Sequence, residues 1–137
     1  MQSKLNPYIN FKGQAKEAME FYKSVFGGKL ELNTFKESGM PVEESEGDQI
    51  MHAMLIADNG MTLMASDTPS HMEYKPGTNI TISLSGEDEA ELSGYWDKLA
   101  FGANISQPLT KAPWGDTFGM LTDKFGIVWL VNITAKK

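Results

Sequence analysis

His52 is the residue of this chain best suited to acid–base or ligand chemistry, because an imidazole titrates near neutral pH. It is one of two histidines, and its surroundings predict the start of a strand that follows an acidic loop. The other, His71, lies in a linker with prolines, where we expect it to be exposed to solvent and to have no functional role. A purely structural role for His52, held by a hydrogen bond at a strand edge, is the alternative.

A serine and two carboxylates accompany this histidine. Ser66 and Asp67 end one predicted strand, and Trp114-Gly115-Asp116 begins another. Ser66 lacks the Gly-x-Ser-x-Gly turn of a nucleophile elbow, which argues against nucleophilic catalysis. Both aspartates also suit the capping of turns. Trp114 suits either stacking on a ligand or filling a dimer interface.

Methionine is the third side chain of interest. The sequence contains nine methionines in 137 residues, and one predicted hairpin holds those at positions 51, 54, 61 and 64. Thioether side chains are flexible and polarisable, so they would line the wall of an apolar cavity adaptably. Ordinary core packing explains them equally well.

Composition excludes several classes of protein. The sequence has no cysteine, which removes disulfides and thiolate chemistry. The net charge of −6 opposes binding to nucleic acid and to anionic membranes. The acidic run at 43–48 lacks the ligand spacing of an EF-hand. No apolar run approaches the roughly 20 residues of a transmembrane helix, and no apolar signal segment begins the chain, so we expect a cytoplasmic protein.

The elements that must position these residues follow a regular order. The first half predicts a strand at 5–11, a helix at 15–26, and strands at 29–35, 51–56 and 61–66. Gly27-Gly28 ends the helix, and Asn59-Gly60 marks a hairpin. Residues 36–49 show no periodicity and are expected to form a mobile loop.

The second half repeats this order. It predicts a strand at 79–84, a helix with the stripe Leu92, Tyr95, Trp96 and Leu99, a short strand near Ile105, and strands at 118–122 and 127–133. A shift of 73 residues places Phe11 on Leu84 and Tyr22 on Tyr95. Each half has one helix to cover one sheet face, so the other face needs a partner from a second module or a second chain. We predict an α+β fold of two tandem βαβββ modules, at 1–67 and 78–137, in a single domain spanning 1–137.

Motifs along nearly the whole chain match a known family in the right order. They are Asn6-Pro7-Tyr8-Ile9-Asn10-Phe11, Ala15, Ala18, Phe21-Tyr22, Phe26-Gly27-Gly28, His52-Ala53, Met64-Ala65-Ser66-Asp67, Trp114-Gly115-Asp116, Phe118-Gly119, Asp123, Phe125-Gly126 and Trp129. The set resembles the PhnB-like proteins of the glyoxalase, bleomycin-resistance and extradiol-dioxygenase (vicinal oxygen chelate) superfamily. The resemblance implies paired βαβββ modules, commonly a homodimer, and a ligand cavity within curved sheets.

The resemblance leads to a functional expectation. We expect a PhnB-like homodimer of glyoxalase-like fold that binds a small, partly apolar organic molecule without a metal or other cofactor. No glycine-rich turn between a strand and a helix is present for S-adenosylmethionine, although some family members carry a methyltransferase label. The alternative is an enzyme with His52 as general acid or base. The candidate ligand-binding residues are Tyr8, Asn10, His52, Met54, Met64, Ser66, Thr81, Trp114 and Asp116.

The resemblance also bears on metal binding. In catalytic relatives a histidine or similar ligand begins the first strand of a module, and a glutamate lies in the closing strand. Counting along this chain places Asn6 and Asn79 at the first position and Met64 and Leu130 at the second. None of them offers a carboxylate or an imidazole, and a thioether is too soft for magnesium or manganese. We therefore predict that the divalent-metal centre is lacking.

Overall fold

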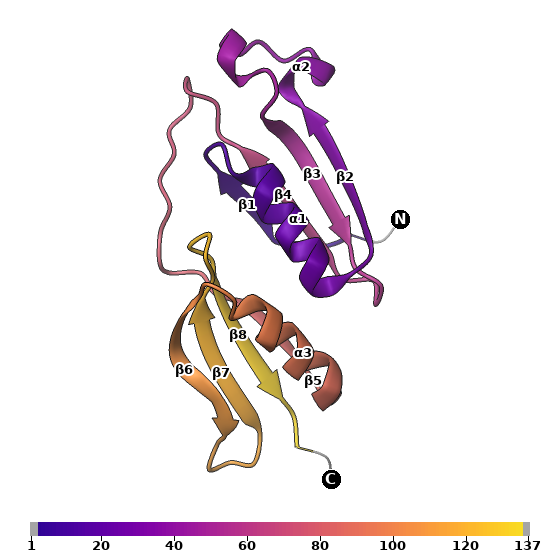
Figure 1. Cartoon of the computed structure of the whole chain (residues 1–137), viewed down its shortest axis with the longest axis vertical. Coiled ribbons are helices and arrows are strands. Elements are labelled where there is room, and N and C mark those ends of the chain that lie inside the picture. Colours follow the sequence, from indigo (N-terminus) through magenta and orange to yellow (C-terminus); the bar gives the residue numbers. More distant parts are fainter. Residues whose placement is uncertain (1–2, 136–137) are drawn as a thin grey trace. The chain divides into compact units, whose positions relative to one another are not determined.

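The chain folds into two compact units, Met1–Pro76 and Gly77–Lys137, in a computed structural model that describes residues 3–135 (Figure 1). Each unit has its own four-stranded sheet, and each follows the order strand, helix and three strands. The predicted α+β architecture of two tandem modules is confirmed.

The first unit is built around one long helix. Its elements are β1 (Tyr8–Phe11), α1 (Ala15–Phe26), β2 (Lys29–Thr34), α2 (Phe35–Ser38), the 3-10 turn η1 (Glu44–Glu46), β3 (Ile50–Ile56) and β4 (Thr62–Asp67). The strand order is β1-β4-β3-β2, with β1 parallel to β4 and the other pairs antiparallel. Apolar residues at helical spacing, from Ala15 to Phe26, give α1 its buried side. Gly27 and Gly28 end it as predicted, with φ of 72° and 97°.

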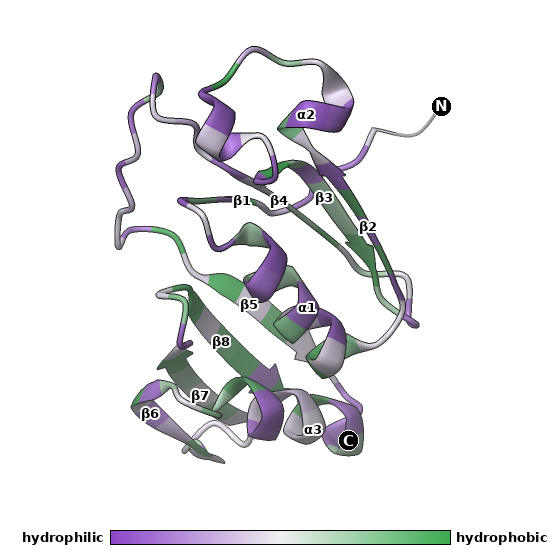
Figure 2. Cartoon of the chain, turned by 45° about the horizontal axis from the view of Figure 1, so that its top comes forward, coloured by the Kyte–Doolittle hydropathy of each residue, from purple (hydrophilic) through white to green (hydrophobic). Residues whose placement is uncertain are grey.

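The second unit repeats the plan. Its elements are β5 (Ile82–Gly86), α3 (Glu89–Leu99), β6 (Asn104–Lys111), β7 (Thr117–Thr122) and β8 (Val128–Ile133), in the strand order β5-β8-β7-β6. The Asp88 side chain caps α3 by accepting a hydrogen bond from the Glu91 N–H at 3.0 Å. Trp129 and Val131 of β8 are buried in the core, and Figure 2 shows β8 largely in the colours of hydrophobic residues.

The register of the internal repeat differs from the predicted shift of 73. The helix N-caps are Gln14 and Asp88, which are 74 positions apart. Consequently Trp96, and not Tyr95, takes the buried place that Tyr22 has in α1. Two adjacent aromatic residues fit a helical stripe equally well in sequence, so only packing decides which of them faces the core.

The predicted loop at 36–49 is folded in part. Thr34 and Glu37 form a capping box that starts α2, with the Glu37 N–H donating to Thr34 Oγ1 at 3.1 Å. Phe35 is buried. The Glu46 carboxylate accepts hydrogen bonds from Ser70 N and Ser70 Oγ, both at 2.9 Å, so the segment is tied to the linker. The alternation at 29–35 includes Thr34 and Phe35 in the predicted strand, and it therefore hides the helix cap at Thr34.

The strand near Ile105 is longer than predicted. β6 extends through Pro108 at the edge of its sheet. Its register shifts between Ile105 and Gln107 and again between Gln107 and Thr110. Edge positions and such irregularities tolerate a proline, which has no N–H to donate to a neighbouring strand.

The first strand of each unit begins later than predicted. Tyr8 and Ile82 are the first residues of β1 and β5, where alternation predicted strands from 5 and 79. Pro7 directly precedes β1, and it lacks an N–H for strand pairing. Alternation continues beyond the paired residues, so it overstates the length of a strand.

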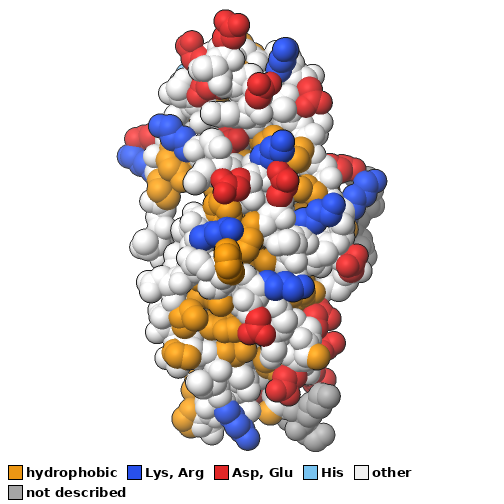
Figure 3. All heavy atoms as spheres, viewed as in Figure 1, with side chains coloured by type: hydrophobic (Ala, Val, Ile, Leu, Met, Phe, Trp, Pro, Cys, Tyr) orange, Lys and Arg blue, Asp and Glu red, His pale blue; other side chains and the backbone are white. Residues whose placement is uncertain are grey.

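No helix within residues 3–135 combines the length and the apolar character that crossing a bilayer requires. Figure 3 shows charged side chains of both signs mixed over the visible face.

Candidate functional site

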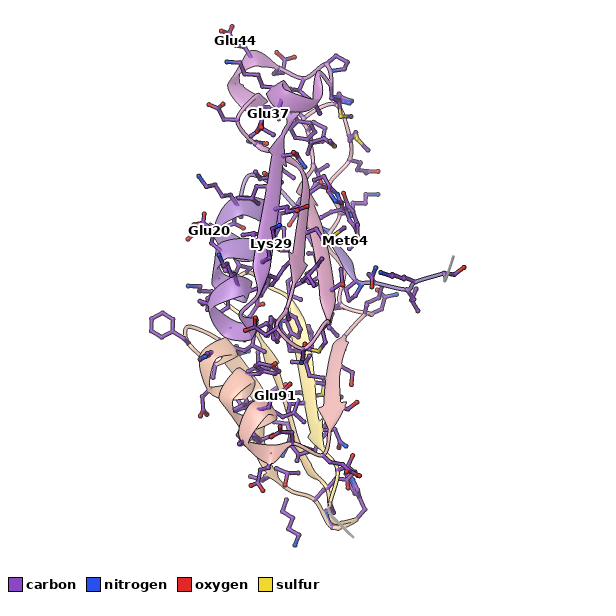
Figure 4. All side chains as sticks on the ribbon, turned by 90° about the vertical axis from the view of Figure 1, so that its right-hand side faces the viewer. Glu20, Lys29, Glu37, Glu44, Met64 and Glu91 are labelled. Atoms are coloured by element: carbon purple, nitrogen blue, oxygen red, sulfur yellow. The ribbon has the colours of Figure 1, made fainter. Side chains whose placement is uncertain are left out.

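The sheet of the first unit has one face that α1 covers and one that it does not. Successive side chains of a strand point to opposite faces. In β3, Ala53 and Leu55 are buried on the side of α1, so His52 and Met54 lie on the other. Figure 4 shows α1 on one side of this sheet and Met64 on the other. We define the first open face by its residues: Tyr8, Asn10, Glu31, Asn33, His52, Met54, Met64 and Ser66.

Strand register arranges the first open face in two rows. In the methionine row, Tyr8 is opposite Met64, Met64 is opposite Met54, and Met54 is opposite Glu31. In the amide row, Asn10 is opposite Ser66, and His52 is opposite Asn33. Neighbouring strands lie about 4.8 Å apart, and residues two positions apart on one strand about 6.6 Å apart. The two rows are therefore adjacent and nearly parallel.

Side-chain contacts join the two rows and hold the amide row together. The rings of Tyr8 and His52 lie 6.0 Å apart with a tilt of 37°. The Ser66 hydroxyl donates to Asn10 Oδ1 at 3.2 Å. His52, Met54 and Met64 are half-buried, whereas Tyr8 is 46% exposed. The face thus places hydrogen-bonding groups beside two thioethers and an aromatic ring, which suits a molecule with a polar and an apolar part.

The structure does not assemble a catalytic triad from these residues. Ser66 and His52 lie on the first open face, but Asp67 points to the side of α1 and is only 3% exposed. Its carboxylate accepts hydrogen bonds from the N–H of Ala15 at 3.0 Å and from the N–H of Ile50 at 2.9 Å. Asp67 therefore holds the start of α1 against the start of β3, the structural role that the sequence left open.

Asp116 of the second unit also makes structural hydrogen bonds. Its Oδ1 accepts from the Ala135 N–H at 3.0 Å, and its Oδ2 accepts from Asn132 Nδ2 at 3.1 Å. The Ala135 N–H first, and then the Asn132 amide, hold the pKa of Asp116 below its ordinary value. The carboxylate thus ties the turn before β7 to the end of β8.

The remaining candidates of the second unit, Thr81 and Trp114, lie outside the strands. Thr81 is exposed directly before β5. Trp114 is 68% exposed in the loop before β7, and its ring centre lies 6.5 Å from that of Phe118. The structure therefore places an aromatic pair near the start of β7.

Sequence reasoning missed part of each open face. Glu31 and Asn33 belong to the first open face, and the alternation of β2 could have assigned them. The face turned away from α3 carries Ser83, Ser85, Phe118, Met120, Leu130 and Asn132. The internal repeat could have identified this second open face. The turns of the two closing hairpins are 66 residues apart, and the same shift relates His52 to Phe118.

The second unit also contains a shallow pocket of about 400 Å³. It is lined by Glu87, Glu89, Lys111, Gly115, Thr117, Ile133, Thr134 and Ala135. These residues belong to the segment leading into α3 and its first residue, the end of β6, the start of β7 and the end of β8. The pocket includes none of the predicted ligand-binding residues.

The residues that lie opposite Met64 and Leu130 differ from those that counting along the sequence predicts. Met64 pairs with Tyr8, and the corresponding Leu130 pairs with Ser83. Counting had placed Asn6 beside Met64, which is two positions too early. A phenol, a thioether, a hydroxyl and an alkyl group do not make a divalent-cation site. Across residues 3–135, moreover, no cluster of three or more His, Cys, Asp or Glu side chains is placed to hold a metal ion.

Comparison with known proteins gives matches over nearly the whole chain. The family model for the glyoxalase/bleomycin resistance protein/dioxygenase superfamily matches residues 4–131. The crystal structure of protein PA1353 from Pseudomonas aeruginosa is 34% identical, with a TM-score of 0.87 over 98% of this chain and 100% of that chain. A PhnB protein from Bacillus cereus is 29% identical, with a TM-score of 0.75 over 96% of this chain and 100% of that one. Protein YjdN from Escherichia coli (strain K12) is 26% identical over 97% of both chains.

Proposed function

Because the chain belongs to the glyoxalase/bleomycin resistance protein/dioxygenase superfamily, we propose that its first open face binds a small, partly apolar organic molecule. One observation supports this proposal. The candidate residues of the first unit all lie on this one face, where polar groups stand beside the two methionines.

Our proposal includes a homodimer that acts in the cytoplasm and binds its ligand without a divalent metal. Each open face has apolar side chains that the helix of its own unit does not cover, and a second copy would cover them. The donor set opposite Met64 and Leu130 supports binding without a metal, because a cation there would have no carboxylate to balance its charge.

Catalysis through His52 is the second candidate. It is favoured by the position of His52, which lies in the amide row, 6.0 Å from the Tyr8 ring and opposite Asn33. A general acid or base must come within hydrogen-bond reach of the reacting proton, and a half-buried imidazole beside a bound molecule meets that condition.

Native mass spectrometry of the purified protein tests the binding function. We expect a co-purified small molecule on the wild-type protein and its loss in Met54→Glu, which sets a charge in the middle of the methionine row. Met61→Glu is the matched control, because Met61 lies in the turn before β4 and is exposed. Retention of the molecule by Met54→Glu at the wild-type level would show that another surface binds it.

The His52→Gln variant separates the two candidates. A binding protein carries the same molecule with either residue. An enzyme releases its product, so the variant would retain an unmodified substrate that the wild-type protein does not hold.

A further inference from the structure

We infer that the ligand of the first open face is a neutral, planar aromatic compound with a carbonyl group attached directly to its ring. This inference rests on the proposed function and adds the chemical class of the ligand. It follows from the spacing, the hydrogen-bonding groups and the charges of the two rows.

The methionine row forms the floor for an aromatic ring. Met54 and Met64 are direct cross-strand partners, so their thioethers leave the sheet about 5 Å apart. Sulfur contacts an aromatic ring favourably at about 5 Å, often at the ring edge. One six-membered ring lying over these two side chains therefore contacts both. Tyr8 ends the row and supplies an aromatic side wall. A saturated ring would bury a similar area but would lack the sulfur–aromatic contacts.

The amide row supplies hydrogen-bond donors on one side of that ring. Asn10 Oδ1 already accepts from the Ser66 hydroxyl, which leaves the N–H groups of the Asn10 amide to donate. Asn33 and His52 stand in the same row, and each also carries an N–H donor. Donors of this kind select an acceptor on the ligand, and a carbonyl oxygen is such an acceptor.

The separation of the rows fixes how far the carbonyl lies from the ring. The rows are about 6.6 Å apart along the strands. A hydrogen bond spans about 2.9 Å of this distance, which leaves about 3.7 Å between the ring centre and the acceptor atom. A carbonyl attached directly to a six-membered ring has this reach, whereas a two-carbon spacer overshoots the row.

Charge on the face argues for a neutral ligand. Glu31 is the carboxylate of the methionine row, and Lys29 lies 3.9 Å from it on the same strand. The two opposite charges lie together at one end of the face, where both side chains are exposed to solvent. An anionic ligand would meet Glu31, and Lys29, which the alternation of β2 places on the same face, already lies beside that carboxylate. A cationic one would compete with Lys29.

Three probes and methionine methyl NMR test this inference on the full chain. The probes are benzamide, cyclohexanecarboxamide, which lacks the aromatic ring, and 3-phenylpropanamide, which moves the carbonyl away by two carbons. Methionine methyl groups are labelled with ¹³C, and Met54→Leu and Met64→Leu assign the two signals. We expect benzamide to shift both signals through its ring current. The signal of Met72, which is exposed in the linker, is the control for nonspecific contact.

Affinity is the second measurement. Benzamide should bind more tightly than either other probe, and each methionine replaced by leucine should weaken it by about two- to tenfold. Met72→Leu should leave the affinity unchanged. Equal affinity of cyclohexanecarboxamide, with the same methionine signals perturbed, would overturn the aromatic class and leave the proposed binding face intact. If no probe shifts the Met54 or Met64 signal, and the co-purified molecule is retained by Met54→Glu, both the inference and the proposed function are wrong.

Discussion

The buried carboxylate of Asp67 provides a sharp test of how the first unit is held together. It accepts hydrogen bonds from the N–H groups of Ala15 and Ile50, at 3.0 and 2.9 Å. Ala15 is 0% and Ile50 2% exposed, so water cannot replace the carboxylate without rearrangement. The substitution Asp67→Ala removes both acceptors at once.

The expected loss follows from the two donors that the substitution leaves buried. An unsatisfied buried donor costs about 1–3 kcal/mol, so Asp67→Ala should lower the free energy of unfolding by about 2–6 kcal/mol. Asp67→Asn keeps one acceptor oxygen and should lose roughly half as much. The matched control is Asp88→Ala, which removes the exposed cap of α3. It should cost about 1 kcal/mol, the usual value for a helix cap.

Urea unfolding followed by far-UV circular dichroism measures these losses. The tryptophans all lie in the second unit, so their fluorescence reports that unit and identifies a loss confined to the first. Hydrogen exchange at Ala15 and Ile50 gives the local readout, and both amides should lose protection in Asp67→Ala. A loss below about 0.5 kcal/mol, within the range of ordinary surface substitutions, would refute the assigned role of Asp67.

Further predictions concern packing, pH, assembly and metal content. Gly119→Ala should cost about 1–3 kcal/mol in urea unfolding followed by tryptophan fluorescence, because its Cβ would lie 2.8 Å from Trp96 Cη2. Gly94→Ala, with open space in α3, should instead stabilise by about 0.5–1 kcal/mol, and equal effects would contradict this packing. The Thr34 hydroxyl and then the Thr34 backbone N–H hold the pKa of Glu37 below its ordinary value. Their stabilisation is therefore present above the unfolded-state pKa and is lost as the pH falls through the lower folded-state pKa. The protection factors of the α2 amides, corrected for the intrinsic exchange rate at each pH, should therefore fall over that range. Thr34→Ala removes the hydroxyl and keeps the backbone N–H, so it should weaken this dependence. Sedimentation should give about twice the chain mass of 15.2 kDa, and a monomer at micromolar concentration would contradict the homodimer. Elemental analysis after dialysis should find no stoichiometric transition metal, whereas a tightly held one would overturn the prediction.

Local features of the fold were predictable from the sequence. The spacing of apolar residues from Ala15 to Phe26 predicts the extent of α1, and Gly27-Gly28 predicts where it ends. The hairpin at Asn59-Gly60 and the α+β class followed from turn chemistry and from the repeat. These features depend on neighbours within a few residues along the chain, which is why one sequence suffices to find them.

The sequence predicted some residues of the candidate site but not how they are paired. Alternation placed Tyr8 and Asn10 on one face of their strand, but it could not pair Tyr8 with Met64 or bring the His52 ring within 6.0 Å of the Tyr8 ring. The pairing of β1 with β4 joins residues more than fifty positions apart, and nothing local specifies its register. A change of one residue would turn the whole row to the other face.

Tertiary packing also decided between roles that the sequence left open. Asp67 follows Ser66 directly, yet the strand turns one to the open face and the other under α1. Likewise, Trp96 rather than Tyr95 is buried in the core at the position that corresponds to Tyr22. The sequence by itself determined the order of elements, the helical and strand periods and the family. The tertiary structure decided register, burial and hydrogen-bond partners, because these depend on contacts between segments that are distant along the chain.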